Sequence, residues 1–189
     1  MKKLWIILGV IFLLFIFGIS WYIGGLNRIV RMNEAVNSSW AEIDNQLKRR
    51  SDLIPNLVST VKGYAKHEKD VFANIADSRA KLAGAGSKSD KIAASNELSS
   101  SLSRLLVVVE NYPNLKADAN FKALMDELAG TENRISVARM RYNRDVKGYN
   151  TYIREVIGGF FARKKGLAEA FPYFEIKEEE KVTPKVSFE

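Results

Sequence analysis

The sequence contains no cysteine and a single histidine, His67. Without cysteine, the chain can form neither a disulfide nor a thiolate metal site, and no cysteine can carry a lipid. A single histidine excludes metal motifs that need a histidine pair, such as HExxH. Gly-rich phosphate loops, nucleophile elbows and paired carboxylates beside a suitable base are also lacking. We therefore infer no catalytic residue, metal, cofactor or small-molecule substrate.

Charged residues are lacking throughout residues 4–23, LWIILGVIFLLFIFGISWYI. An α-helix of about 20 residues, at about 1.5 Å per residue, crosses the roughly 30 Å of hydrocarbon in a bilayer. Trp5, Trp21 and Tyr22 lie near the ends of the run, where aromatic rings suit the headgroup layers. A signal peptide would have a shorter apolar region leading into a small-residue cleavage site. We therefore expect an uncleaved, single-pass anchor in the cell membrane, with the lipid bilayer as its partner.

The chain as a whole is basic, with a formal net charge of +7, and the acidic stretch EIKEEEK lies near its C-terminus. On an anchored protein, a basic surface suits anionic lipid or an acidic partner better than nucleic acid, so we expect no nucleic-acid partner. Lys2, Lys3 and the α-amino group precede the apolar run, and Arg28 and Arg31 follow it. This slight excess favours an inside N-terminus, although large domains respond weakly to the charge rule.

Apolar residues at helical spacing continue beyond the anchor and predict an all-α domain. The first stripe consists of Ile29, Met32, Val36, Trp40, Ile43 and Leu47. Residues three and four apart share one face of a helix. On this basis we predict helices over residues 27–50, 53–83, 89–111 and 119–157. In the first of these helices, Arg50 falls in the last turn, where a cation complements the helix dipole.

Local signals place the ends of these helices. Gly84-Ala85-Gly86-Ser87 supplies a glycine after one helix and an N-cap for the next. Pro113 stops the third helix, and Asp118 can cap the fourth.

Pro55 leaves two interpretations open. A turn capped by Ser51 or Asp52 gives four bundle helices, whereas a kink in one long helix gives three. We favour the turn. The predicted fold is thus all-α, with an N-terminal transmembrane helix followed by an antiparallel bundle of long helices. The expected parts are residues 1–26 as tail and anchor, 27–174 as the bundle, and 175–189 as a disordered charged tail.

Three stretches of the chain resemble the LemA family. They are QLKRRSDLIPNLVSTVKGYAKHE (46–68), NYPNLKADANFKALMDELAGTENRISVARMRYN (111–143), and DVKGYNTYI leading into FPYFE (145–175). With the anchor they cover nearly the whole chain in order. The resemblance implies a bacterial-type, single-pass membrane protein with a helical-bundle domain and no established enzymatic activity.

Two charged residues, Glu68 and Arg79, fall on the apolar stripe of the second predicted helix. Because a buried carboxylate without a partner is costly, we expect Glu68 to bond a basic or amide group of another helix, such as Arg139, in a buried polar network. The alternatives are snorkelling at a helix end and a ligand or catalytic role. His67 faces about 100° away from Glu68 and is expected to be solvated.

Tyr142-Asn143 and Tyr149-Asn150 recur seven residues apart. Both tyrosines therefore point into one seam, and the asparagines lie at its margin. Such a repeat fixes the register of a bundle, because misalignment leaves amides unsatisfied. A tyrosine-lined groove for a partner helix or peptide is the alternative.

Residues 105–109, LLVVV, cover nearly the whole circumference of a helix with apolar side chains. A helix that buries one stripe needs only part of this set. We therefore expect Val107, on the far side, to be covered by another element or another chain.

A segment after Gly158-Gly159 is both aromatic and basic. Its residues of interest are Phe160, Phe161, Arg163, Lys164 and Lys165. If the bundle returns this segment to the bilayer, its rings enter the headgroup boundary and its cations meet anionic lipid. If the segment lies at the far end, it caps the bundle or contacts a partner. Proximity of Phe160 to Leu26 distinguishes the two.

The function that fits best is non-enzymatic: a membrane-tethered interaction or scaffolding module that recruits another protein or a copy of itself. A basic lipid- or nucleic-acid-binding module would need the arginines of the last helix on one open face with aromatic neighbours. A membrane-bound enzyme would need a carboxylate cluster in a pocket around Glu68.

Overall fold

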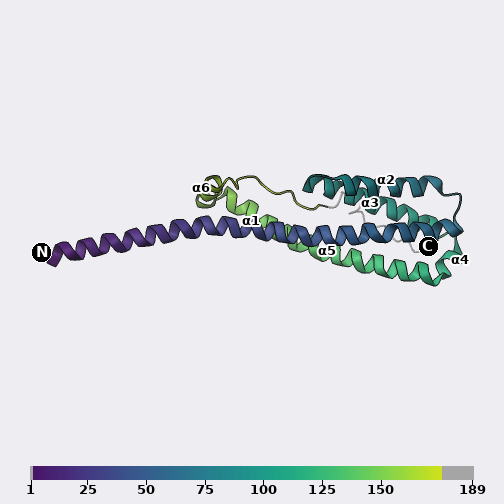
Figure 1. Cartoon of the computed structure of the whole chain (residues 1–189), viewed down its shortest axis with the longest axis horizontal. Coiled ribbons are helices and arrows are strands. Elements are labelled where there is room, and N and C mark those ends of the chain that lie inside the picture. The colour runs from purple at the N-terminus through teal and green to yellow at the C-terminus, as the bar shows by residue number, and fades with distance from the viewer. Residues whose placement is uncertain (1, 176–189) are drawn as a thin grey trace, which may run out of the picture. The chain divides into compact units, whose positions relative to one another are not determined.

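The computed structural model describes residues 2–175, which contain six α-helices and no strand (Figure 1). The helices are α1 (Lys2–Tyr64), α2 (Lys69–Gly84), α3 (Lys88–Val109), α4 (Pro113–Ala117), α5 (Ala119–Arg154) and α6 (Val156–Lys165). The prediction of an all-α fold with a long N-terminal apolar helix is confirmed. The predicted disordered tail lies, apart from Glu175, outside the described residues.

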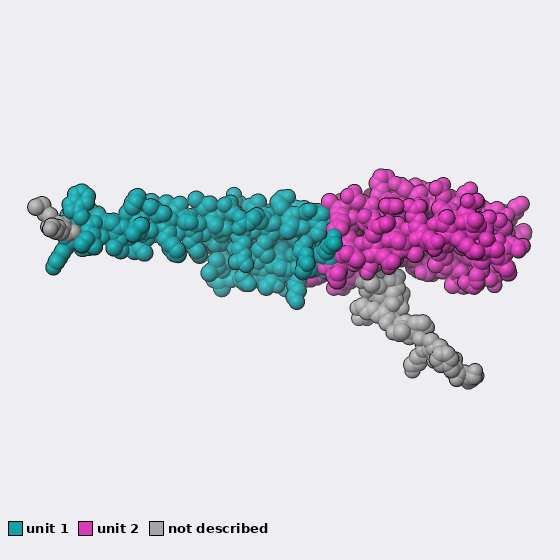
Figure 2. All heavy atoms as spheres, turned by 90° about the horizontal axis from the view of Figure 1, so that it is seen from below, with its two compact units in different colours: residues 1–40, 141–171 teal, residues 41–140, 172–189 magenta. Residues whose placement is uncertain are grey.

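Two compact units share these helices (Figure 2). Unit 1 consists of residues 1–40 and 141–171, and unit 2 consists of residues 41–140 and 172–189. Both α1 and α5 contribute to both units. The predicted boundaries at residues 26 and 174 stay a prediction.

Helix α1 continues through Pro55, so our preference for a turn there was wrong. A proline inside a helix cannot donate to the carbonyl four residues earlier, which here is that of Ser51. Arg79 of α2 donates its Nε–H to this Ser51 oxygen at 3.0 Å. The tertiary bond replaces the one that Pro55 removes. The chain reverses only after Tyr64, in residues 65–68.

Unit 2 is an antiparallel bundle of four long helical segments: residues 41–64 of α1, α2, α3, and residues 119–140 of α5. The short connections at 65–68 and 85–87 reverse the chain direction. Its core includes Ile43, Ile54, Ile75, Leu98, Leu105 and Ile135, all nearly inaccessible to solvent. The predicted helix over residues 53–83 is divided here, because its first part continues α1 to Tyr64 and its second part is α2.

Two predicted N-caps are present. The Ser87 hydroxyl accepts the backbone N–H of Asp90 at 3.0 Å, and Oδ1 of Asp118 accepts that of Phe121 at 2.9 Å. The last predicted helix is shorter than expected, because α5 ends at Arg154 and α6 begins separately. Helix α6 ends at Gly166, whose φ of 68° suits glycine.

Unit 1 packs residues 24–40 of α1 against α5 and α6. Its core includes Ile29, Val36, Tyr142, Val146 and Tyr149. The large apolar side chains of residues 4–23 are exposed. Among the described residues, α1 is the one helix that is long and apolar enough to cross a membrane, by length and composition.

Candidate functional site

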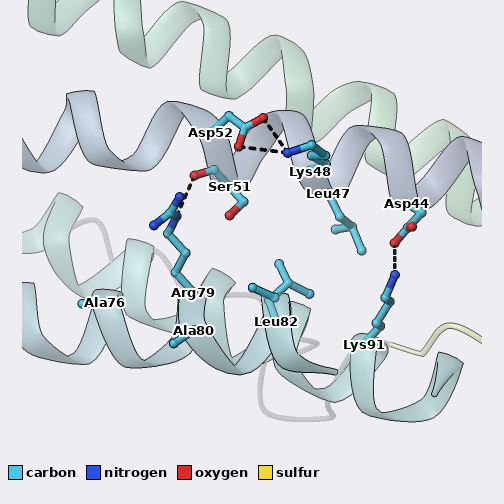
Figure 3. Close-up of a pocket in the computed structure, with 11 residues that line it drawn as sticks. Asp44, Leu47, Lys48, Ser51, Asp52, Ala76, Arg79, Ala80, Leu82 and Lys91 are labelled. Atoms are coloured by element: carbon cyan, nitrogen blue, oxygen red, sulfur yellow. Dashed lines mark hydrogen bonds and ion pairs between the residues drawn. The ribbon is translucent and has the colours of Figure 1, made fainter. Parts of the chain in front are cut away.

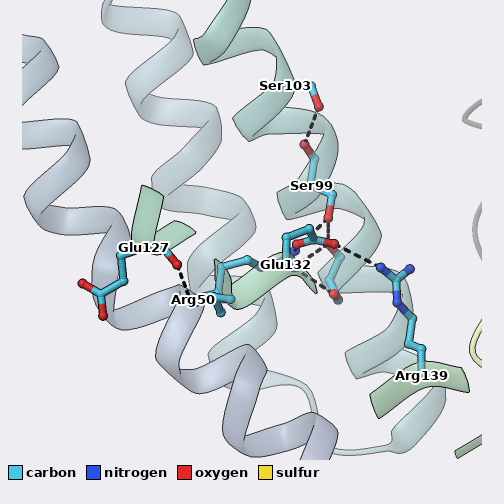
Figure 4. Close-up of polar contacts among 8 residues, drawn as sticks. Arg50, Ser99, Ser103, Glu127, Glu132 and Arg139 are labelled. Atoms are coloured by element: carbon cyan, nitrogen blue, oxygen red, sulfur yellow. Dashed lines mark hydrogen bonds and ion pairs between the residues drawn. The ribbon is translucent and has the colours of Figure 1, made fainter. Parts of the chain in front are cut away.

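The core of unit 2 encloses a charged side chain, Arg50 of α1, of which 1% is exposed. Its Nη1 donates to Glu132 of α5 at 2.9 Å and to the hydroxyl of Ser99 of α3 at 3.0 Å (Figure 4). Its Nη2 donates to the hydroxyl and the carbonyl of Ser95 at 2.9 and 3.1 Å. Arg139 donates to the other carboxylate oxygen of Glu132 at 3.0 Å. This group, the Arg50 network, ties three helices together.

Burial lowers the pKa of Arg50, and the nearby Glu132 carboxylate opposes that shift. The Glu132 side chain is 45% exposed, so the network opens to solvent at its acidic end. Both Nη groups of Arg50 already have two acceptors each. The network therefore serves as a link between helices rather than as a free cation for a ligand.

The structure does not bring the three predicted network residues together. Glu68 is half-buried and accepts the hydroxyl of Tyr112 at 3.3 Å. Arg79 contacts the α1 backbone, and Arg139 belongs to the Arg50 network. Glu68 has this different partner because it lies in the turn before α2 rather than within a continuous helix. His67 is exposed.

Sequence reasoning missed Arg50, although a signal was present. Arg50 lies three residues after Leu47 and four before Ile54, both of which are buried. This spacing places it on the core stripe of α1. We ended the helix at residue 50 and interpreted Arg50 as a cation at a helix terminus, which was wrong.

A cleft of about 400 Å³ opens in unit 2 between α1 and the α2–α3 pair (Figure 3). Small side chains of α2 leave part of this space open, namely Ala76, Ala80 and Ala83, while Arg79 and Leu82 of the same helix also line it. The charges on its rim pair with one another, Lys48 with Asp52 and Lys91 with Asp44. The cleft therefore shows no convergent set of groups for chemistry. Among residues 2–175, no group of three or more His, Asp or Glu could hold a metal ion.

The predicted register repeat lies in unit 1. Its residues are Tyr142, Tyr149 and Asn150, which are buried, and Asn143, which is half-buried. The Tyr149 hydroxyl donates to the carbonyl of Leu167 at 2.6 Å. The Asn150 amide donates to the carbonyl of Phe171 at 2.9 Å and accepts its N–H at 3.0 Å. These side chains fasten the segment that follows α6, and the register role stays a prediction.

Burial also raises the pKa of Tyr142 to about 12. Its ring lies 5.3 Å from that of Trp40. The attachment of residues 167–171 could not be found from the sequence, because Tyr149 and Asn150 bind backbone groups that every sequence offers.

Phe161 of α6 packs against α1 where the apolar run ends, and 1% of it is exposed. Its ring centroid lies 5.3 Å from that of Trp21 and 5.8 Å from that of Tyr22. Gly25 permits this approach, because a Cβ there would overlap the Phe161 ring. Phe160 is 5.3 Å from Phe161, ring to ring, so it lies beside the end of the run, as the membrane-contact hypothesis requires. The expectation that both rings enter the headgroup boundary was wrong for Phe161, because α1 covers it. Contact of Phe160 with lipid stays a prediction.

Val107 of α3 is 70% exposed, whereas Leu105 and Val109 in the same run are buried. No described element covers it, so the expectation of cover within the chain was wrong. Cover by another chain stays a prediction.

A nucleic-acid surface combines exposed cations with exposed aromatic rings. The aromatic residues of this helix, Phe121, Tyr142, Tyr149 and Tyr152, are all buried. Stacking of bases on rings of α5 is therefore not available.

Comparison with known proteins identifies relatives. The model of the LemA family matches residues 39–188. Magnetosome protein MamQ 2 of Paramagnetospirillum magneticum is 25% identical over 177 residues, 80% of this chain and 65% of its own. Magnetosome protein MamQ of Magnetospirillum gryphiswaldense is 25% identical, covering 67% and 56%. Protein LemA of Metamycoplasma hominis is 23% identical, covering 70% and 61%. The chain thus spans less than two thirds of the length of these relatives.

Proposed function

The chain belongs to the LemA family, and from its geometry we propose that it is a membrane-tethered helical module that holds another protein, or a second copy of itself, at the bilayer. The anchor is residues 4–23, and the helical part beyond it supplies the binding surface. The excess of positive charge at Lys2 and Lys3 supports an inside N-terminus. Protease accessibility of the C-terminal part in intact cells and in opened cells tests this orientation.

The exposure of Val107 carries the proposal. Bare apolar side chains on a helix are unfavourable in water, and Leu106 beside Val107 is exposed as well. The neighbouring Ser103 and Arg104 are polar and exposed. An apolar centre with a polar rim is the composition typical of protein–protein contacts.

The test compares Val107→Asp with Ser103→Asp. Both substitutions add one negative charge to an exposed position on the same face of α3. Position 107 lies in the last turn, where an acidic side chain opposes the helix dipole by about 0.3–1 kcal/mol, so the helix content of both variants is compared by circular dichroism. We expect the native chain, solubilised from its own membranes in mild detergent, to migrate as a complex larger than one chain. Val107→Asp should release the single chain, and Ser103→Asp should not. Native migration as a single chain, or equal behaviour of both variants, would contradict the proposal.

A further inference from the structure

We propose that α6 is a second membrane contact, which binds the headgroup layer of an anionic lipid surface beside the transmembrane anchor. This contact uses unit 1 alone. It is independent of the protein-binding surface around Val107, so either proposal can fail without the other.

The position of α6 along the anchor is set by Phe161. Its ring lies against Trp21 and Tyr22, near the end of the apolar run, and against Gly25, two residues beyond it. Trp and Tyr at the end of a membrane span lie at the level of the headgroups. A helix fastened to these two rings is therefore held at the same depth.

One face of α6, next to the side on which Phe161 lies, is apolar and exposed. Val156 is 90% exposed, and Ile157 and Phe160 are exposed too. Residues 156, 157 and 160 share one side of a helix, while Gly158, Gly159 and Ala162 are buried with Phe161. No described part of the chain covers this face. In the headgroup boundary it would be buried in the interfacial layer.

The charge at the end of α6 selects the kind of lipid. The last turn carries Arg163, Lys164 and Lys165, and the Lys164 ammonium lies 6.0 Å from the centroid of the Phe160 ring. Cations placed beside apolar side chains on an interfacial helix attract anionic headgroups.

A further cation, Arg28, lines a cleft of about 350 Å³ between α1 and α6. At about 1.5 Å per residue, Arg28 lies roughly 7.5 Å beyond Ile23, the end of the apolar run. This distance corresponds to the depth of the lipid phosphates. The Arg28 guanidinium is 4.5 Å from the centroid of the Tyr152 ring. Glu155 also lines the cleft, and its negative charge disfavours the binding of an anion there. The cations of α6 and Arg28 outnumber this one carboxylate, so the surface as a whole favours anionic lipid.

The experiment measures the depth of α6 in the full chain. Because the sequence contains no cysteine, Val156→Cys gives a single site for a spin label. The labelled chain is reconstituted into vesicles of phosphatidylcholine alone or with phosphatidylglycerol, and collisions with oxygen and with a water-soluble nickel chelate are compared. Ser59→Cys serves as the exposed reference, because it lies outside unit 1 and away from the surface around Val107.

We expect the label at position 156 to be shielded from the nickel chelate several-fold more strongly in anionic vesicles than in neutral ones, and less so in high salt. The label at position 59 should remain accessible in both. Replacing Arg163, Lys164 and Lys165 by Gln together should remove the difference between the two lipid compositions. Accessibility at 156 equal to that at 59 would overturn the membrane contact. Equal shielding in both lipids would overturn the role of the cations.

A matched pair of glycine substitutions tests whether Phe161 sets this depth. Gly25→Leu places a side chain where the Phe161 ring lies, whereas a Cβ at Gly24 meets no atom within 4 Å. We expect Gly25→Leu to make the label at 156 accessible to the nickel chelate and Gly24→Leu to leave the label shielded. The same result from both variants would overturn the inference that Phe161 fastens α6 at the headgroup level.

Discussion

Unit 2 encloses a guanidinium in its core, whereas unit 1 encloses aromatic rings. Arg50 makes directional hydrogen bonds to groups of α3 and α5, which are satisfied in only one alignment of the helices. Phe161 makes a close, non-directional contact with a glycine on α1. The difference teaches that unit 1 is sensitive to a change in the shape of its packed side chains, whereas unit 2 is sensitive to the loss of a charge partner.

The largest expected effect is in unit 1, from Phe161→Ala. Removing a fully buried phenylalanine ring typically costs about 3–5 kcal/mol. Since Phe161 is the largest buried side chain of this short helix, we expect the α6 amides to exchange with deuterium on the order of 100-fold faster. Phe160→Ala is the control, because that neighbouring ring is exposed. If both variants exchange alike, Phe161 is not the residue that holds α6.

The matching experiment in unit 2 is Glu132→Ala. It leaves Arg50 buried without its carboxylate, and because Glu132 is 45% exposed the expected cost is about 1.5–3 kcal/mol, below that of a fully buried pair. Glu127→Ala is the control on the same helix, because its pair with Arg49 is exposed on both sides and worth less than about 1 kcal/mol. Urea unfolding of the full chain in detergent micelles, followed by circular dichroism, measures both. Similar losses would show that the burial of Arg50 has no energetic consequence.

A smaller effect is expected where α2 meets α1. Arg79→Met removes the hydrogen bond to the Ser51 carbonyl, which Pro55 leaves without a helical donor. We expect this substitution to lower the free energy of unfolding by about 1.5 kcal/mol. In a Pro55→Ala background the backbone N–H of residue 55 can take over. The cost of Arg79→Met should then fall by about 1 kcal/mol. An unchanged cost in the double-mutant cycle would refute the link between these two residues.

The smallest expected effect concerns the cap of α5. The Asp118 carboxylate accepts hydrogen bonds from the Phe121 N–H and from the Tyr64 hydroxyl, and these lower its pKa, the Phe121 bond more than the Tyr64 bond. The hydrogen bond between Tyr64 and Asp118 also raises the pKa of Tyr64. A carboxyl group with a lowered folded pKa stabilises above its unfolded pKa of about 3.9 and loses that contribution as pH falls through the folded value. Asp118→Ala should therefore lower the melting temperature at pH 7, and the gap from the native chain should narrow below about pH 4. A gap that is constant with pH would mean that the charge is not involved.

Local sequence signals were sufficient for most of the fold. The caps at Ser87 and Asp118 act within three residues of their partners, and the apolar stripes act within one helix. Pro55 was misjudged because its effect depends on Arg79, which lies far away in sequence. A local rule cannot include a donor supplied by another helix.

The candidate sites were less predictable for the same reason. Phe160 and Phe161 could be singled out by composition, but which of them is buried depends on Gly25, well over a hundred residues earlier in the chain. Glu68 was expected to bond a basic or amide group of another helix, yet the carboxylate that holds a buried cation is Glu132. An apolar stripe shows that a charge is unusual without identifying its partner.

The most direct test of the contrast between a protein-binding unit 2 and a lipid-binding unit 1 is photo-crosslinking from two positions. A photoreactive phenylalanine analogue replaces either Val107 or Val156 in the full chain, and adducts formed in native membranes are identified by mass. We predict protein adducts from position 107 and phospholipid adducts from position 156. Protein adducts from position 156, or lipid adducts from position 107, would contradict this division of roles.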